Sequence, residues 1–302
     1  MVQNTGGRNR ATFNNTATLT FNDRTIQSNT VTGEITPVLG ITKTAVGDRY
    51  AHGDTVTYAV SVTNSGDTAY TAATLTDNLG AYAFGTRELV PLTYVPGSLR
   101  LYQNGVLQTT PVVSGENPLV IDGITVPAGG NVLIVYATRV NQYAPLGLTT
   151  DGTAAAIVNT ATLTDARLPA PITASATISA DSAPALTITK SLCPATVSQN
   201  GTLRYTFVIQ NTGATPVTAE DEAAIADTFE TRNGTLAVTF NGTAWASPTQ
   251  YTYNDETGAF TTVPGQVVVP AATYTQNAET GAWSIVPGVS ELILTGTGVS
   301  VR

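Results

Sequence analysis

The sequence carries two sets of residues whose side chains could form a covalent bond inside a protein core. Lys43, Asp77 and Asn159 make the first set, and Lys190 and Asp227 repeat its first two members later in the chain. A lysine amine shielded from water can attack an asparagine side-chain amide, and a neighbouring aspartic acid can pass protons between them. The product is an isopeptide bond, which forms once and without turnover.

Alternation along strands predicts that these polar side chains face inward, because residues two apart on a strand share a face. Each has apolar neighbours on its own face: Lys43 has Leu39 and Ile41, Asp77 has Leu75 and Leu79, Asn159 has Ala161 and Leu163, Lys190 has Leu186 and Ile188, Asp227 has Ile225 and Phe229, and Asn15 has Ala17 and Leu19. The pattern therefore places lysine, aspartate and asparagine side chains in apolar cores.

Burying unpaired charges costs several kcal/mol per ion, and two arrangements would relieve that cost. In the first, lysine and aspartate form a buried ion pair and the asparagine supplies hydrogen bonds. In the second, burial lowers the pKa of the lysine and raises that of the aspartate, and the neutral amine attacks the asparagine carbonyl as ammonia leaves. The residues alone leave both arrangements open.

An internal repeat supplies the elements that would position these residues. Two stretches, beginning at Leu39 and Ala185, share steps of 15 and 6 residues between a lysine, a tyrosine and an asparagine: Lys43, Tyr58 and Asn64 in the first, and Lys190, Tyr205 and Asn211 in the second. Their strands follow period two, and turn signals such as NSGD and QNTG separate them. The pattern predicts an all-β protein of two tandem immunoglobulin-like β-sandwiches, at 38–182 and 183–302, with a hairpin insertion at about 240–285 in the second.

The second repeat lacks the strands that close the first one. The hexamer NTATLT closes the first repeat at 159–164, and it recurs at 15–20, ahead of any sandwich. We therefore expect residues 1–37 to be an arm of donor strands that completes the second sandwich of another copy. Such head-to-tail contacts give an open filament unless the rotation closes a ring. A disordered arm and a closed monomer are the alternatives.

The sequence resembles a prokaryotic surface-protein repeat, the domain of unknown function eleven. The resemblance rests on the ITK start, the GDTVTY strand, the VTNSGD turn, the LTDNLG segment and the closing VNTATLT, and it covers about Leu39 to Asp181 well. That family is immunoglobulin-like and similar to Cna-type pilin and adhesin modules with Lys–Asn isopeptide bonds. The resemblance implies a surface location, on a cell or a spore.

Carried over residue by residue, the resemblance implies a bond between Lys43 and Asn159, with Asp77 as its helper. In the second repeat Lys190 and Asp227 match, but ILTGTGVSVR offers no asparagine at the closing position. The missing partner would then be Asn15 of another copy, with Asp227 as the helper, and the bond would link two subunits covalently.

Composition and motifs argue against several other classes of function. The net charge is −8 with no basic run, so nucleic-acid binding is not expected. No apolar run reaches the roughly 18 residues that a membrane helix needs, and the N-terminus does not resemble a signal peptide. No nucleophile motif, phosphate loop or metal-ligand spacing is present, so we expect no turnover enzyme, cofactor or metal. Cys193, the only cysteine, has no partner for a disulfide within the chain.

An adhesin or carbohydrate-binding module is the alternative function. It would use aromatic rings of the second repeat to stack on sugars: Trp245, Tyr251, Tyr253 and Trp283. Strand aromatics are more often core residues, and we expect Phe260 and Trp283 to lie on hairpin arms that pack on the second sandwich. No host or glycan ligand can be named from the sequence.

Overall fold

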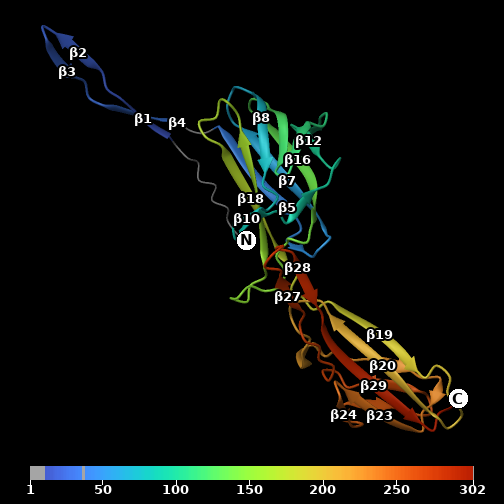
Figure 1. Cartoon of the computed structure of the whole chain (residues 1–302). Helices are drawn as coiled ribbons and strands as arrows, with labels where there is room; N and C mark the ends of the chain where they lie inside the picture. Colours follow the sequence, from blue (N-terminus) through green and yellow to red (C-terminus); the bar gives the residue numbers. More distant parts are fainter. Residues whose placement is uncertain (1–10, 36–37, 302) are drawn as a thin grey trace.

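The chain forms two β-sandwiches in series with a hairpin projecting from one end (Figure 1). The computed structural model describes residues 11–35 and 38–301. Strands make up nearly all of its regular structure, beside one short 3₁₀ turn at Ala219–Asp221 (η1). The predicted all-β sandwich fold is confirmed. No helix in the described part of the chain has the length and apolarity to cross a membrane.

The first sandwich packs two large sheets face to face. One sheet has the order β13(Val106–Leu107), β12(Arg100–Gln103), β16(Asn131–Val140), β7(Thr55–Asn64) and β5(Leu39–Val46), and β11(Leu92–Tyr94) also pairs with β16. The other has the order β14(Val112–Glu116), β15(Leu119–Val126), β8(Tyr70–Asp77), β17(Ala156–Thr164), β18(Ile172–Ala180) and β6(Arg49–Tyr50). A small hairpin, β9(Tyr82–Phe84) and β10(Arg87–Leu89), lies beside them.

Strict alternation builds the first core. Along β7 and β16 every second residue is buried, which gives the inward rows Val56, Tyr58, Val60 and Val62, and Val132, Ile134 and Tyr136. Edge strand β5 is covered on its inward face by β18 of the opposite sheet. Lys43 on β5 is consequently buried.

The second sandwich has a counterpart of the β5-containing sheet of the first sandwich, but only a partial counterpart of the β8-containing sheet. Its first sheet has the order β19(Leu186–Cys193), β20(Thr202–Asn211), β29(Gly288–Thr297), β23(Thr235–Phe240) and β24(Thr243–Trp245). Its other sheet has three strands among the described residues: β21(Ala226–Thr228), β26(Ala259–Thr262) and β25(Tyr251–Tyr253). The strand β22(Thr231–Arg232) pairs with β30(Ser300–Val301).

Matching pairs identify these strands with those of the first sandwich. Asp77 of β8 faces Leu119 of β15, and Asp227 of β21 faces Phe260 of β26. The β25–β26 hairpin thus corresponds to β14–β15 and is a regular part of the sheet. The predicted insertion at about 240–285 reduces to one extra hairpin, β27(Thr273–Gln276) and β28(Trp283–Val286).

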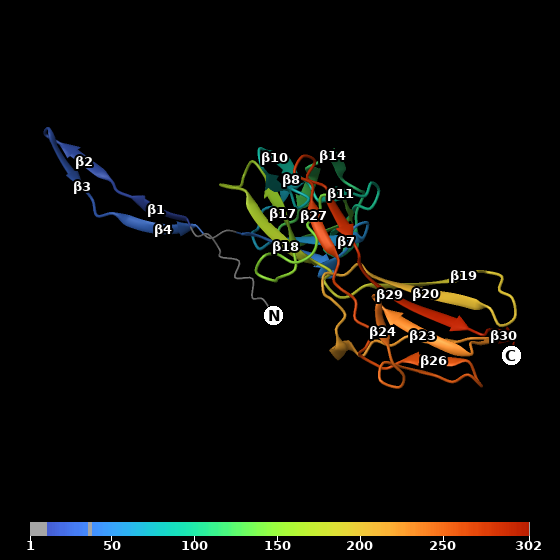
Figure 2. The same cartoon turned by 60° about the horizontal axis from the view of Figure 1, so that its bottom comes forward.

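This extra hairpin packs against the first sandwich (Figure 2). Tyr274 and Trp283 lie against the first core, whereas Phe260 belongs to the second core. The prediction was therefore correct for Phe260 and wrong for Trp283. The sequence pattern predicts that a hairpin forms, but it does not indicate which of the two sandwiches the hairpin contacts.

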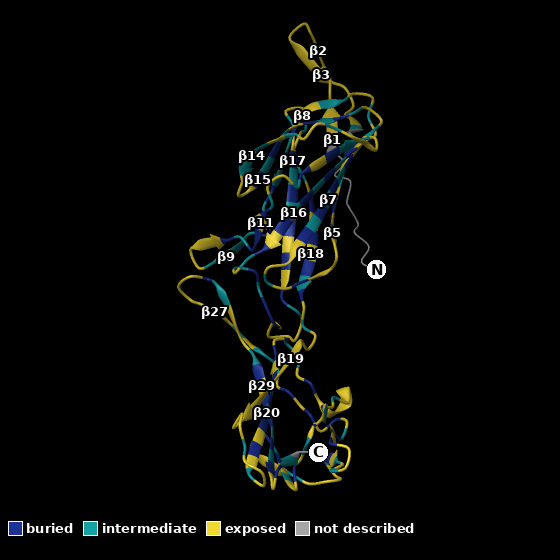
Figure 3. Ribbon diagram, turned by 90° about the vertical axis from the view of Figure 1, so that its right-hand side faces the viewer, coloured by how far each residue is buried: buried dark blue, intermediate teal, exposed yellow. Residues whose placement is uncertain are grey.

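The N-terminal segment forms an isolated, two-part hairpin (residues 11–35), which we call the donor hairpin after the role that the sequence predicts for it. β1(Ala11–Asn15) pairs with β4(Val31–Ile35), and β2(Thr18–Phe21) pairs with β3(Arg24–Gln27). Asn22 and Asp23 form its tip with φ values of 42° and 60°, the backbone of a tight hairpin turn. Its apolar residues are exposed, as Figure 3 shows for β2 and β3: Phe13, Leu19, Phe21, Ile26 and Val31.

Candidate functional site

The first sandwich brings Lys43, Asp77 and Asn159 into one core. Lys43 lies on β5 of one sheet, while Asp77 on β8 and Asn159 on β17 come from the opposite sheet. The side chains of Lys43 and Asp77 are 0% exposed, and Asn159 is also 0% exposed. The alternation argument thus placed all three side chains on the correct face.

Lys43 and Asp77 form a direct ion pair. Lys43 Nζ lies 2.5 Å from Asp77 Oδ2, and the Tyr136 hydroxyl donates to the same oxygen. The backbone N–H of Leu79 donates to Asp77 Oδ1 at 2.9 Å. The carboxyl group is therefore held in one orientation by three donors.

The surroundings of Lys43 favour its neutral amine more strongly than the surroundings of a solvent-exposed lysine do. Burial lowers the pKa of Lys43 from 10.5 to about 8, although Asp77 opposes this shift. The Lys43 amine also lies 4.8 Å from the ring centre of Tyr58 and 6.0 Å from that of Tyr136. The lowered pKa makes the neutral amine easier to form near neutral pH than at an ordinary lysine.

Asn159 has no hydrogen-bond partner for its side chain. Both its Oδ1 and its Nδ2 are buried and unpaired, and so is the hydroxyl of Tyr58. The amide acts electrostatically on the hydroxyls of Tyr58 and Tyr136, although no hydrogen bond of normal geometry joins them. An unpaired buried amide costs about 1–3 kcal/mol. The arrangement with a simple Lys–Asp ion pair does not explain this side chain, because the asparagine would be hydrogen-bonded in it.

The set of groups fits nucleophilic attack on an amide. Lys43 supplies the amine, Asn159 an amide without a hydrogen bond of normal geometry, and Asp77 a carboxyl group beside the amine. In the same core, Tyr58 and Tyr136 are two tyrosines whose pKa values burial raises, so both stay protonated donors. Sequence reasoning missed these tyrosines; their inward positions in VTYAVSV and NVLIVYATRV were the available signal.

The second sandwich holds the corresponding pair in an open setting. Lys190 Nζ contacts Asp227 Oδ2, but the Lys190 side chain is 40% exposed and that of Asp227 18%. Lys190 still lies over the rings of Tyr205, Phe229 and Phe207, as Lys43 lies over Tyr58 and Tyr136. Leu294 stands opposite Tyr205 where Tyr136 stands opposite Tyr58, so Asp227 has no equivalent tyrosine donor.

One side of the second sandwich is uncovered, and we call it the open face. It consists of the inward side of β19 and the unpaired edge of β21. The residues of β19 on that side are exposed although they share the face of Lys190: Leu186, Ile188 and Leu192. In the first sandwich β17 pairs with β8 and β18 covers β5, and no described strand occupies those positions in the second. The free thiol of Cys193 is exposed at the end of β19.

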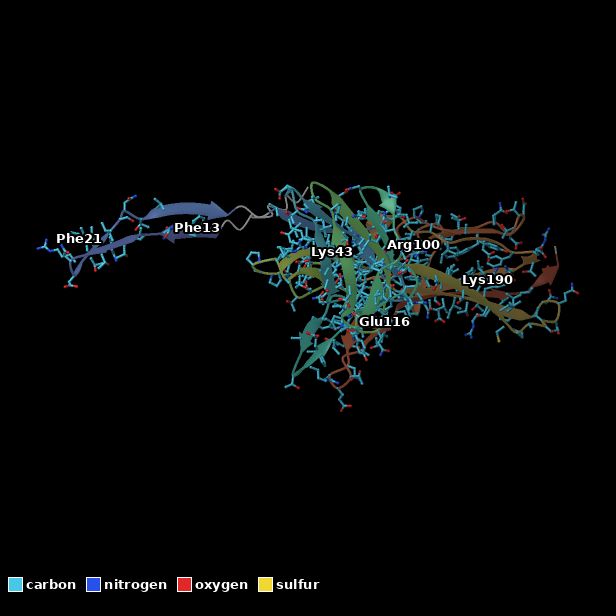
Figure 4. All side chains as sticks on the ribbon, turned by 90° about the horizontal axis from the view of Figure 1, so that it is seen from above. Phe13, Phe21, Lys43, Arg100, Glu116 and Lys190 are labelled. Carbon is cyan, nitrogen blue, oxygen red and sulfur yellow. The ribbon has the colours of Figure 1, made fainter. Side chains whose placement is uncertain are left out.

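Asn15 is not near Lys190 within one chain. Figure 4 shows Phe13 and Phe21 at one end of the molecule, Lys190 toward the other, and Lys43 between them. Asn15 lies in β1 of the donor hairpin, where its backbone pairs with Val31.

The aromatic residues considered for sugar binding are engaged in packing. Trp245 stacks on Phe240 with ring centres 4.8 Å apart, Tyr251 is buried against Phe260, and Trp283 packs on the first core. Tyr253, the fourth candidate, packs against the second core, and its hydroxyl donates to Asp255 Oδ1 at 3.2 Å. In the described part of the chain, no three His, Cys, Asp or Glu side chains are placed to hold a metal ion.

Comparisons with known proteins give only distant likenesses. No family model and no curated protein matches, so the resemblance to the domain of unknown function eleven stays a prediction. The pilus backbone RrgB of Streptococcus pneumoniae matches 82% of this chain and 55% of its own, with 12% identity and a TM-score of 0.34. The chain thus spans about half the length of RrgB; a full-length structure of that protein is covered to 42%.

Two further solved structures give scores of the same order. The pilus 2b backbone protein of group B streptococcus matches 82% of this chain and 79% of its own, with 13% identity and a TM-score of 0.34. The type II cohesin dyad of the ScaA scaffoldin of Acetivibrio cellulolyticus matches 87% and 88%, with 12% identity and a TM-score of 0.26. These values assign no family, and function has to be derived from the geometry of the chain itself.

Proposed function

We propose that this chain is the structural subunit of a self-assembling filament on the outside of a cell or spore. The donor hairpin of one copy occupies the open face of the second sandwich of the preceding copy, and repetition of this contact builds a head-to-tail homopolymer. One observation carries the proposal. The donor hairpin repeats the sequence and, apart from one extra residue between Ile26 and Val31, the pairing of β17–β18, the two strands for which the second sandwich has no counterpart among the described residues.

The match extends to individual cross-strand pairs. Leu19 faces Ile26 in the donor hairpin as Leu163 faces Ile172 in the first sandwich. A hydroxyl pair joins the strands in both hairpins, Thr16 with Thr30 at 3.0 Å and Thr160 with Ser175 at 2.8 Å.

The hairpin match also fixes the position of Asn15. Asn15 faces Val31 as Asn159 faces Ala176. A docked hairpin in the register of β17–β18 therefore presents Asn15 to the second core.

Burial and backbone pairing would drive the docking. The donor hairpin exposes a row of apolar side chains, and the open face exposes Leu186, Ile188 and Leu192. Covering both removes apolar surface from water at about 25 cal/mol per Å², and β1–β2 would pair with the free edge of β21. Because β4 leads within a few residues into β5, as β18 leads into β19, the docked copy continues the series of sandwiches in the same direction.

A covalent link between copies follows from the same register. Asn15 of the docked hairpin would stand to Lys190 and Asp227 as Asn159 stands to Lys43 and Asp77. The Lys190 Nζ–Asn15 Cγ bond forms, the Asn15 Cγ–Nδ2 bond breaks, and ammonia leaves after Asp227 relays a proton to it. The same reaction within the first sandwich joins Lys43 to Asn159. Each site reacts once, so the protein is no turnover enzyme.

Electron microscopy and denaturing gels of the purified chain test this function. Wild-type protein is expected to form fibres and a ladder of bands that survives boiling in SDS. Asn15→Ala should form fibres that fall to monomers on the gel, while the control Asn14→Ala, next to it on the other strand face, keeps the ladder. Leu19→Asp should form no fibres.

Each alternative result has a defined meaning for the proposal. Clean monomers from intact wild-type fibres would overturn the covalent link alone. Absence of fibres from wild-type protein at all concentrations would overturn the filament itself.

A further inference from the structure

One cross-strand pair of the donor hairpin departs from the pattern of β17–β18. Phe13 faces Gly33, whereas the corresponding pair in the first sandwich is Ile157 and Ile178. The Phe13 ring lies directly over Gly33: a Cβ added to residue 33 would be 2.3 Å from Phe13 Cζ. The hairpin therefore carries one large ring on β1, and this ring fills the space beside β4 where a side chain of residue 33 would lie.

The same position in the first sandwich has no room for a larger residue. Ile157 and Ile178 are 1% and 0% exposed, and a Cβ on Gly80 would lie 2.4 Å from Ile157 Cγ2. The slot is thus filled by an isoleucine pressed onto a glycine. A phenylalanine in place of Ile157 would collide there.

The second sandwich is built differently around that position. Counting from the matching aspartates, Phe229 replaces Leu79 and Glu230 replaces Gly80. The Phe229 ring is buried and stacks on Tyr205 with centres 4.6 Å apart. The wall is therefore bulkier on the side that meets β1. The Phe13 ring lies over Gly33, at the place that Ile178 fills in the first sandwich, and this leaves room for the bulkier wall.

We propose that the Phe13–Gly33 pair is the specificity element of the docking contact, a role that rests on the proposed filament function. It directs the donor hairpin to second sandwiches and away from exchange with β17–β18 of a first sandwich. Phe13 also lies two residues before Asn15 on the same strand face. Seating the ring in its slot fixes the register, and a slip of one residue would turn Asn15 outward.

The test moves the ring without changing the composition of the full-length chain. The swapped variant Phe13→Gly/Gly33→Phe keeps the ring and the glycine but exchanges their strands. We expect it to polymerise at least tenfold more slowly than wild type, by light scattering. The variant Phe13→Ile/Gly33→Ile, which recreates the pair of the first sandwich, should lose selectivity, so that peptide mapping finds Asn15 linked to Lys43 as well as to Lys190.

The outcomes separate this inference from the filament function. Wild-type fibres together with a swapped variant that assembles at the wild-type rate would overturn the specificity role and leave the filament standing. Failure of wild-type protein to assemble would overturn both. Noncovalent wild-type fibres leave the rate comparison as the deciding measurement.

A second inference comes from the β27–β28 hairpin and does not depend on Phe13. The hairpin is tied to the first sandwich by three hydrogen bonds. Trp283 N donates to Gln142 O at 2.9 Å, Gln276 Nε2 donates to the Tyr82 hydroxyl at 3.0 Å, and the Arg87 guanidinium donates to the carbonyl oxygen of Glu279. Its Gly281 packs so closely on Leu89 that an added Cβ would lie 2.3 Å from Leu89 Cδ1. These contacts bridge the joint between the two sandwiches of one chain.

The first sandwich has only a short turn where the second one carries this hairpin. Asn64 Nδ2 donates to Pro127 O at 3.0 Å, and Asn211 Nδ2 donates to Pro270 O at 3.1 Å, so the two prolines are equivalent. After Pro127 the chain reaches β16 within four residues, whereas seventeen residues separate Pro270 from Gly288. In a filament, the short turn is the one that would face the preceding copy.

We infer that β27–β28 is a clamp that stiffens the joint inside each subunit, and that the joint between subunits has no such clamp. The filament then alternates stiff and compliant joints. Replacing residues 271–287 by Ala-Gly, the turn of the first sandwich, should broaden the distribution of angles between the two sandwiches of one copy. The milder variant Trp283→Ala should do so in part.

Single-particle electron microscopy of the Leu19→Asp monomer measures this angle without assembly. Small-angle X-ray scattering on the same samples checks that both sandwiches stay folded. An unchanged angular distribution in both variants would overturn the clamp. Filaments in which both kinds of joint bend equally would overturn the alternation, even if the clamp holds.

Discussion

The core around Lys43 contains one polar side chain with a full set of hydrogen-bond partners and another with none. Asp77 has three donors around it, whereas the amide of Asn159 has no partner. Bond formation would convert the buried Lys43 amine and the unpaired Asn159 amide into one isopeptide amide and release ammonia. At the scale of single residues, this difference favours the isopeptide arrangement over the simple ion pair.

Removing Asn159 should therefore remove a cross-link as well as a side chain. In the Leu19→Asp background, which does not assemble, the chain is expected to weigh less than its sequence by one ammonia, and adding Asn159→Ala should restore the full sequence mass. By analogy with a disulfide that closes a loop of about a hundred residues, the variant should lose about 4–5 kcal/mol of unfolding free energy. Intact-mass spectrometry and denaturant unfolding measure both quantities. A Leu19→Asp mass without the deficit would contradict the bond.

The pH dependence of the Asn159→Ala variant follows from Lys43, which there keeps its amine. Its folded pKa of about 8 lies below the ordinary 10.5, so between these values the unfolded chain binds more protons than the folded one. The unfolding free energy should therefore rise from pH 8 to pH 10.5, by up to about 3 kcal/mol, and the gain is absent below pH 8. Denaturant titrations at several pH values measure it. Adding Lys43→Met should abolish the rise, and a flat profile in the single variant would contradict the pKa.

The donor hairpin is already paired within itself in the single chain, before any docking of the kind proposed. Its two-residue tip holds Asn22 and Asp23 at positive φ, which glycine and asparagine tolerate best. Folding the hairpin in advance reduces the ordering cost that docking would otherwise carry.

Changes at this tip should alter assembly without touching the docking face. Asp23→Gly should favour the folded hairpin and speed polymerisation by a few-fold. Asn22→Val places a β-branched residue at positive φ, at a cost of about 1–2 kcal/mol, and should slow it about tenfold. Light-scattering kinetics give the rates. Equal rates for all three proteins would mean that the hairpin folds only after contact.

Much of the element structure could be predicted because alternation and repeats are local or self-similar signals. VTYAVSV and LRYTFVI fixed two central strands, and NTATLT marked the donor hairpin as a counterpart of β17–β18. The role of β25–β26 and the destination of Trp283 could not be predicted. Both depend on which body a hairpin contacts, and the pattern of its own residues is the same in either case.

The candidate site was also predictable in part: the sequence indicated which strand faces its residues occupy, but not every residue that takes part. The strand faces of Lys43, Asp77 and Asn159 follow from period two. Tyr58 and Tyr136 are equally inward, but a tyrosine in a strand looks like any core aromatic until its hydroxyl is seen beside a carboxylate. The replacement of Tyr136 by Leu294 in the second sandwich could be found only after register pairs had aligned the two sheets.

At the scale of the whole molecule, charge opposes association. Every copy carries a net charge of −8, so two approaching copies repel each other. Raising the ionic strength from about 0.01 M to about 0.15 M shortens the screening length from about 30 Å to about 8 Å. Assembly should therefore become several-fold faster over this range, as measured by the initial rate of light scattering. A rate that falls with salt would indicate local charge attraction at the contact.

The open face of the second sandwich has a consequence for what stability means in this protein. The first sandwich is complete within one chain, so its melting temperature should not depend on how much protein is present. In the proposed filament the second sandwich gains its missing surface from a neighbour. Its melting temperature should then rise with protein concentration by mass action as long as the contact is noncovalent, for example in Asn15→Ala. One polypeptide would then contain a domain whose stability is intrinsic and a domain whose stability is a property of the population.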